Sequence, residues 1–139
     1  MSYAHTIELN GSFDESVRMI RAALAEQGFG VLTEIDVAAT FTAKLGQEAA
    51  ASVGDYLILG ACNPPLAHRA ITADPDIGVL LPCNVVVRRG PGADRTIVQA
   101  IDPATMVQLS GRPGMAEVAA EVDTKLRAAL ASVEAAEAR

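Results

Sequence analysis

The amino-acid sequence predicts an α+β fold, one mixed sheet with helices packed on it, in the order β-α-β-(α)-β-α-β-β-α. Segments rich in β-branched and other apolar residues alternate with segments whose apolar residues recur at helical spacing. Gly, Pro and Asn mark most boundaries between these segments. The 139 residues, of which 50% are hydrophobic and 20% charged, suffice for one globular core, so a single domain over residues 1–139 is expected.

The beginning of the chain predicts a strand followed by a helix. Residues 5–8 alternate and end at the turn pair Asn10-Gly11. Ser12 with Glu15 three residues later has the pattern of a capping box, and Gly28 ends the helix. The buried face of this helix is predicted from apolar residues at helical spacing: Phe13, Val17, Ile20 and Leu24.

A second strand and a short helix follow. Residues 31–35 form a β-prone run that ends at Asp36, a residue suited to cap a helix over 37–45. Gly46 ends that helix. Residues 47–54 predict a loop or a helical turn.

The middle of the chain predicts the interior of the sheet. Residues 55–62 are apolar without alternation, which is typical of a central strand covered on both faces. Asn63-Pro64-Pro65 then predicts the start of a helix, because the first turn does not use the N–H that proline lacks. This helix is expected to end near Ala73.

The last part of the chain predicts a hairpin and a long closing helix. Its segments are, in order, a turn over 74–76, an apolar approach over 78–81, a strand over 83–89 after Pro82, a loop over 90–94, a strand over 96–101, a helical turn at Asp102-Pro103, and a helix from near Pro113. Residues 34–39 and 100–105 both run from a strand end into a helical turn, which raises the hypothesis of an internal duplication.

Charge and hydropathy exclude several functions. Eleven Lys and Arg against 17 Asp and Glu give a formal charge of −6, which disfavours nucleic acid as a partner. No apolar stretch approaches the ~20 residues that span a bilayer, so no membrane segment is expected. The first residues lack a basic segment followed by an apolar one, so a cytoplasmic protein is expected. No phosphate-binding or dinucleotide-binding motif is present.

Two Cys-Asn pairs form the candidate ligand-binding site: Cys62-Asn63 at a strand end and Cys83-Asn84 at a strand start. Such junctions are where sheets with helices often bind ligands. Cys62 precedes a helix start, where the helix dipole favours the thiolate. Pro64 and Pro65 remove two N–H donors there, which weakens the case for an anion site.

His68, in the second turn of the same predicted helix, is the third candidate ligand. With both cysteines it would give three donors and one open position, as in hydrolytic zinc sites, although the spacing matches no strong metal motif. His5 has a weaker claim, and no triad is evident from the sequence. Two further interpretations stay open: a dithiol exchange site, and two buried cysteines that only pack.

Several short segments together carry a family resemblance: Gly28-Phe29, Ile35-Asp36-Val37, Lys44-Leu45-Gly46, Leu59-Gly60-Ala61-Cys62-Asn63-Pro64, and Asp74-Pro75 leading through Gly78 to Leu81-Pro82-Cys83-Asn84. On these residues the chain resembles the domain-of-unknown-function family DUF302, over almost its whole length. The resemblance implies a mixed α+β domain that forms a homodimer, with no established activity. It also implies that the two cysteines mark a subgroup and are not required by the fold.

Three functional hypotheses follow. The first is a homodimeric cytoplasmic module that binds a small molecule or a metal ion near Cys62-Asn63 and Cys83-Asn84. The second is a thiol-dependent enzyme or redox protein in which Cys62 is the nucleophile, Cys83 resolves and His68 is the base. The third is a structural or interaction protein whose cysteines are packing residues. The sequence identifies no cofactor and no reaction.

Overall fold

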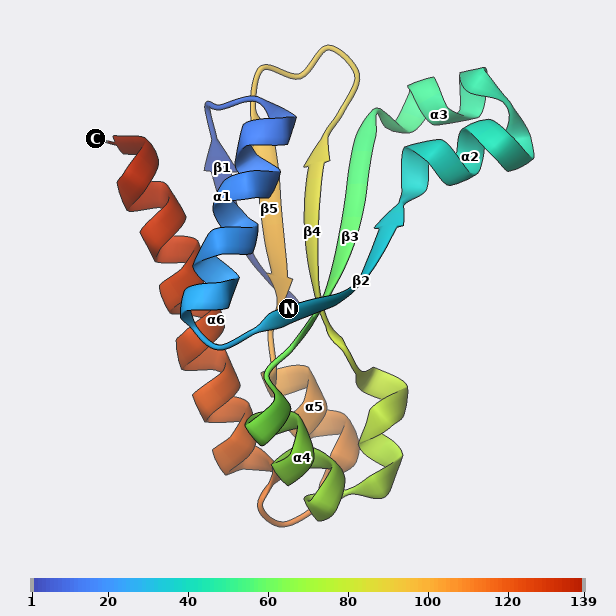
Figure 1. Cartoon of the computed structure of the whole chain (residues 1–139). Helices are drawn as coiled ribbons and strands as arrows, with labels where there is room; N and C mark the ends of the chain where they lie inside the picture. The colour runs from blue at the N-terminus through green and yellow to red at the C-terminus, as the bar shows by residue number, and fades with distance from the viewer. Residues whose placement is uncertain (1, 139) are drawn as a thin grey trace.

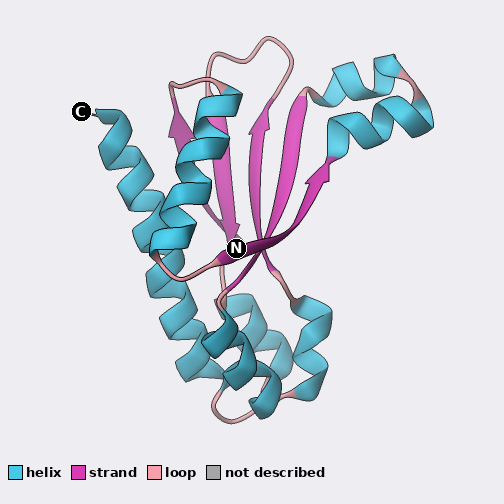
Figure 2. Ribbon diagram, viewed as in Figure 1, coloured by secondary structure: helices cyan, strands magenta, loops and turns pink. Residues whose placement is uncertain are grey.

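A computed structural model describes residues 2–138 and shows helices on one face and beyond both ends of a single sheet (Figures 1 and 2). The elements are β1 (Ala4–Leu9), α1 (Phe13–Glu26), β2 (Gly30–Asp36), α2 (Val37–Leu45), α3 (Gln47–Val53), β3 (Asp55–Cys62), α4 (Pro64–Ala73), the 3-10 helix η1 (Pro75–Leu80), β4 (Cys83–Arg89), β5 (Thr96–Ile101), α5 (Ala104–Ser110) and α6 (Met115–Ala138). The α+β class is therefore confirmed.

The sheet has the order β1-β5-β4-β3-β2, and each neighbouring pair is antiparallel. The prediction of a mixed sheet is wrong in this respect. The connection through α1 carries the chain from β1 at one edge to β2 at the other, so these two strands run in the same direction without pairing. Each of β5, β4 and β3 pairs on both sides with strands that run in the opposite direction.

One face of the sheet packs against α1 and α6 and forms the main core (Figure 1). Alternate residues of the strands point into this layer, where Leu59, Val85 and Val98 are fully buried. They meet Ile20 of α1 and Leu126 of α6. β3 lies inside the sheet, as predicted, but its second face is only half-buried, so the expected cover on both faces is not complete.

A second group of helices lies beyond one end of the strands. There α4, η1, α5 and the first turns of α6 pack together around Leu66, Ile77, Met106 and Met115 (Figure 1). The predicted apolar approach to β4 is part of the helix η1, and the strand itself begins at Cys83 as predicted. This helical group forms one wall of the candidate site.

At the opposite end, α2 and α3 form an arm that projects from β2 and β3 (Figure 1). Asp36 caps α2 as predicted, because its side chain accepts a hydrogen bond of 2.9 Å from the Ala39 N–H. Residues 47–53, expected to be a loop or a helical turn, form the helix α3. No helix within residues 2–138 has both the length and the apolar character needed to cross a bilayer.

Candidate functional site

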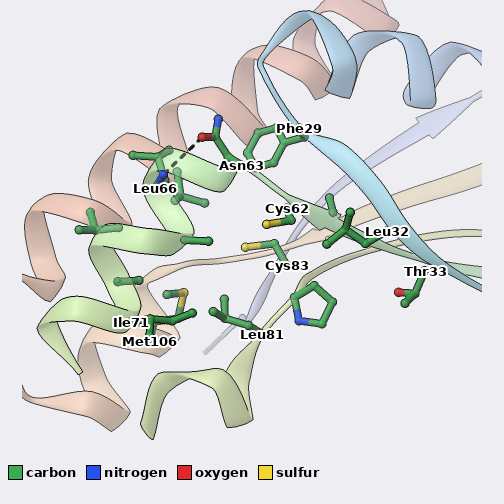
Figure 3. A pocket seen from close by; sticks show the side chains of 16 residues that line it. Phe29, Leu32, Thr33, Cys62, Asn63, Leu66, Ile71, Leu81, Cys83 and Met106 are labelled. Carbon is green, nitrogen blue, oxygen red and sulfur yellow. Dashed lines mark hydrogen bonds between the residues drawn. The ribbon is translucent and has the colours of Figure 1, made fainter. Parts of the chain in front are cut away.

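The candidate site is a cavity of about 310 Å³ between the ends of β2, β3 and β4 and the helical group (Figure 3). Its wall is largely apolar and includes Phe29, Leu66, Ile71, Leu81, Met106 and Val122. Polar atoms come from Thr33, Asn63 and the two thiols, and no Asp, Glu, Lys or Arg is among the sixteen lining residues. The cavity therefore suits an uncharged, mostly apolar molecule.

Both predicted cysteines line this cavity. Cys62 is the last residue of β3 and half-buried, and Cys83 is the first residue of β4 and buried. The register pairs Ala61 with Cys83, so Cys62 lies one residue beyond the partner of Cys83, where β3 ends. In Figure 3 both sulfur atoms point toward the α4 side of the cavity. The structure thus brings together the two junctions that the sequence singled out, and both thiols are free.

The two thiols have different surroundings. Burial, and to a smaller extent the nearby Cys62 thiol, raises the pKa of the Cys83 thiol from 9.0 to about 11. Cys83 is only 6% exposed and is therefore a protonated, sheltered thiol at neutral pH. Cys62 is the more accessible of the two, so a reagent that enters the cavity meets it first.

Asn63 caps α4, as the sequence predicted. Its Oδ1 accepts a hydrogen bond of 3.4 Å from the Leu66 N–H, and its Nδ2 donates one of 3.3 Å to the Gln27 carbonyl. The first bond caps α4 at its start, directly before two prolines, and the second connects this helix to the end of α1. Asn63 therefore positions one wall of the cavity, and its amide makes hydrogen bonds within the fold.

We expect Asn63→Ala to lower the free energy of unfolding by about 1–2 kcal/mol, because it removes the cap and leaves buried backbone groups without a partner. The exposed Asn84 provides the matched control, and Asn84→Ala is expected to change stability by less than about 0.5 kcal/mol. Urea denaturation of both variants measures the difference. Equal losses in the two variants would contradict the assigned role of Asn63.

Two of the predicted site residues lie outside the cavity. Asn84 is exposed on β4 and does not line the cavity, since its side chain alternates with that of Cys83. His68 is exposed on α4 and lines a separate shallow hollow with Arg69 and Glu117. The helix presents Leu66 and Ala70 to the cavity, and His68 lies on another side of it. The structure does not bring His68 to the two thiols.

Most of the wall was not evident from the sequence. Leu32 lies where the β2–β3 register shifts, and Met106 and Val122 come from α5 and α6, far along the chain. Val122 belongs to the buried apolar stripe of α6, and the residues next to it in the sequence do not indicate what it faces. Only the tertiary arrangement brings these residues around the thiols.

The comparisons with known proteins agree with the fold. The family model described as "Domain of unknown function DUF302" matches residues 5–133. A crystal structure of an uncharacterized conserved DUF302 protein from Bacillus stearothermophilus superposes with a TM-score of 0.79 at 28% identity, covering 94% of this chain and 97% of that one. Among curated proteins, nothing matches the chain. The chain therefore belongs to the DUF302 family.

Proposed function

We propose that the protein binds a small, uncharged, apolar molecule in the cavity beside Cys62 and Cys83. One observation carries the proposal: a cavity of about 310 Å³ has an apolar wall with only a few polar atoms. Volumes of roughly 300–1,000 Å³ with this wall chemistry are typical of small-molecule sites. Burial of apolar surface, at about 25 cal/mol per Å², is the driving force for binding.

The wall chemistry also narrows the class of ligand. A charged group would lose its hydration without meeting an opposite charge on the cavity wall, so a neutral molecule is favoured. One Asn63 N–H donates to Gln27 and its Oδ1 accepts from Leu66, so the thiols and Thr33 are the main partners for one polar end. We therefore expect an aromatic or aliphatic body with at most one weakly polar group.

Filling the cavity tests this function. Ala67 lies on α4 at the cavity wall and is half-buried, so Ala67→Phe places a ring in the space of the ligand. We expect this variant to bind the neutral fluorescent probe N-phenylnaphthylamine at least ~10-fold more weakly than the wild type, because even a single methylene of misfit costs about 1–3 kcal/mol in an apolar pocket. Fluorescence titration measures the affinity.

Ala116→Phe provides the control for that experiment. Ala116 is exposed near the start of α6 and is not part of the cavity wall, so the same substitution there is expected to leave probe affinity unchanged. If both variants bind the probe like the wild type, the cavity is not the binding site. Circular dichroism shows that each variant retains its helices.

The position of both thiols on one cavity wall supports a second candidate function, thiol–disulfide exchange. The Cys62 thiolate would attack the S–S bond of a small uncharged disulfide such as 2-hydroxyethyl disulfide, forming a mixed disulfide and releasing one thiol. Deprotonated Cys83 would then attack the Cys62 sulfur, forming an intramolecular disulfide and releasing the second thiol. Mass spectrometry after this treatment should show the internal disulfide in the wild type and the mixed disulfide in Cys83→Ala. A wild type left fully reduced would exclude the reaction.

For assembly, we propose a homodimer that uses the arm. No residue of α2 is buried, and Ile35 and Leu45 are 49% and 67% exposed. A second copy of the chain would cover such apolar side chains. We expect Leu45→Lys to shift a dimer toward monomer in sedimentation velocity, and a monomeric wild type would contradict the proposal. We also propose the cytoplasmic location expected from the sequence, a compartment in which thiols such as Cys62 and Cys83 stay reduced.

A further inference from the structure

A second cluster of potential ligands lies away from the thiol cavity, at the β1 edge of the sheet. The His5 Nε2 atom lies 2.6 Å from Asp123 Oδ1 and 3.8 Å from Asp102 Oδ1. One donor atom from each of the three residues falls within 4.8 Å of the others. Within residues 2–138, this is the group of three such donors that the structure assembles. None of the three lines the thiol cavity.

Three elements hold these side chains in place. His5 lies in β1, where it pairs with Ala100 of β5, and Asp102 follows the end of β5. The Asp102 N–H donates a hydrogen bond of 2.8 Å to the Tyr3 carbonyl, which fixes Asp102 relative to β1. Asp123 projects from the middle of the long helix α6. Donors on rigid elements are pre-organised, so they lose little conformational entropy when they bind an ion.

The carboxylates have outer hydrogen bonds of the kind that orients metal ligands. Arg127 Nε lies 2.9 Å from Asp123 Oδ2, the oxygen that does not face His5. The Ala104 N–H donates to Asp102 Oδ1 at 2.9 Å. A carboxylate offers about four lone-pair sites on its two oxygens, so these bonds leave acceptors for an ion. Such outer partners fix the direction of the ligand atoms.

We propose that His5, Asp102 and Asp123 bind a divalent cation of the zinc class. One imidazole and two carboxylates are the mixed nitrogen and oxygen donors that such ions accept. With bonds of about 2.0–2.2 Å, tetrahedral ligand atoms lie roughly 3.3–3.6 Å apart. The His5 Nε2 separations of 2.6 and 3.8 Å lie on either side of that value, and the two carboxylate oxygens lie within 4.8 Å of each other, so shifts on the order of 1 Å bring the three atoms around an ion that replaces the His5–Asp123 hydrogen bond.

The exposure of the cluster allows the ion to enter. The three side chains are 17%, 27% and 28% exposed for His5, Asp102 and Asp123, and His5 also borders a shallow hollow with Arg127 and Glu134. Water can therefore reach the ion and supply a fourth ligand. Two carboxylates beside one arginine leave a net negative charge when the imidazole is neutral, which favours a cation.

Zinc titration tests the proposal, and the thiols must first be removed because they also bind zinc. In the Cys62→Ala/Cys83→Ala background, competition with a chromophoric chelator should show one bound zinc per chain. His5→Gln and Asp123→Asn should each weaken it at least ~10-fold. His68→Gln should leave the affinity unchanged, because His68 is an exposed histidine outside the cluster. Circular dichroism and the melting temperature establish that each variant is folded.

Two results would overturn the proposal. One is a cysteine-free protein that binds no stoichiometric zinc, because His5 would then serve only to join β1 to α6 through its bond to Asp123. The other is an affinity that both His5→Gln and Asp102→Asn leave unchanged. Asp102→Asn is the milder substitution, because the Asp102 side chain is more exposed than that of His5. It tests the site if the His5→Gln variant does not fold.

Discussion

A Gly54→Ala variant should lose about 3–5 kcal/mol of unfolding free energy, one of the largest single-residue effects in this chain. Gly54 has φ 80° and ψ −154°, a region that is essentially restricted to glycine. An added Cβ would also lie well inside van der Waals contact with the Arg89 carbonyl oxygen and 3.0 Å from the Gly90 carbonyl carbon. Gly54 immediately precedes β3, beside the end of β4, so the clash disturbs the central strands.

Gly46→Ala separates the two causes of that loss. Gly46 also has a positive φ, 98°, but an added Cβ there would have no atom of the described chain within 4 Å. The Gly46→Ala variant should therefore lose only the part of the unfolding free energy that comes from the strained backbone conformation, about 1–3 kcal/mol. Chemical denaturation of both variants gives the contribution of the clash as the difference. Equal losses would show that β3 and β4 do not approach each other closely at Gly54.

The second large effect concerns the reactivity of Cys83. Its pKa of about 11, against 9.0 for an unperturbed thiol, lowers the thiolate fraction at neutral pH about 100-fold. We expect iodoacetamide to alkylate Cys83 in the folded Cys62→Ala variant at least ~100-fold more slowly than in the same chain unfolded in urea. Mass spectrometry follows the rate. A folded rate within about threefold of the unfolded rate would contradict the burial of this thiol.

The same pKa makes stability depend on alkaline pH. Below pH 9 both the folded and the unfolded protein keep the Cys83 proton, so this group causes no change. Between pH 9 and 11 the unfolded chain releases the proton while the folded protein retains it, so the unfolding free energy falls by about 2–3 kcal/mol. Cys83→Ala should lack this fall. Denaturation at pH 8 and pH 10.5 compares the two proteins.

Local signals predicted the elements well because they act over a few residues. Ser12 accepts a hydrogen bond from the Glu15 N–H, and Asp36 and Asn63 cap the helices that the sequence assigned to them. The strand over Cys83–Arg89 and the strand over Thr96–Ile101 have the predicted bounds. Each of these depends on the residue and its immediate neighbours.

Long-range arrangement was less predictable. The antiparallel order follows from the path of the connection through α1 across the sheet, which no local pattern encodes. The two cysteines stood out in the sequence because they end and begin predicted strands, and the structure places both at the cavity wall. Asp102 and Asp123 were not singled out, since the tertiary fold alone brings them to His5. His68 lies outside the cavity because its helix faces the cavity with another side.

The most direct test of ligand binding beside the thiols is protection of Cys62 from alkylation by the bound probe. Cys62 lies at the cavity wall, so N-phenylnaphthylamine at saturation should slow its reaction with iodoacetamide at least ~10-fold. The half-maximal effect should occur at the dissociation constant found by fluorescence, and Ala67→Phe should abolish the protection. An alkylation rate that saturating probe leaves unchanged would place the probe elsewhere and contradict the account.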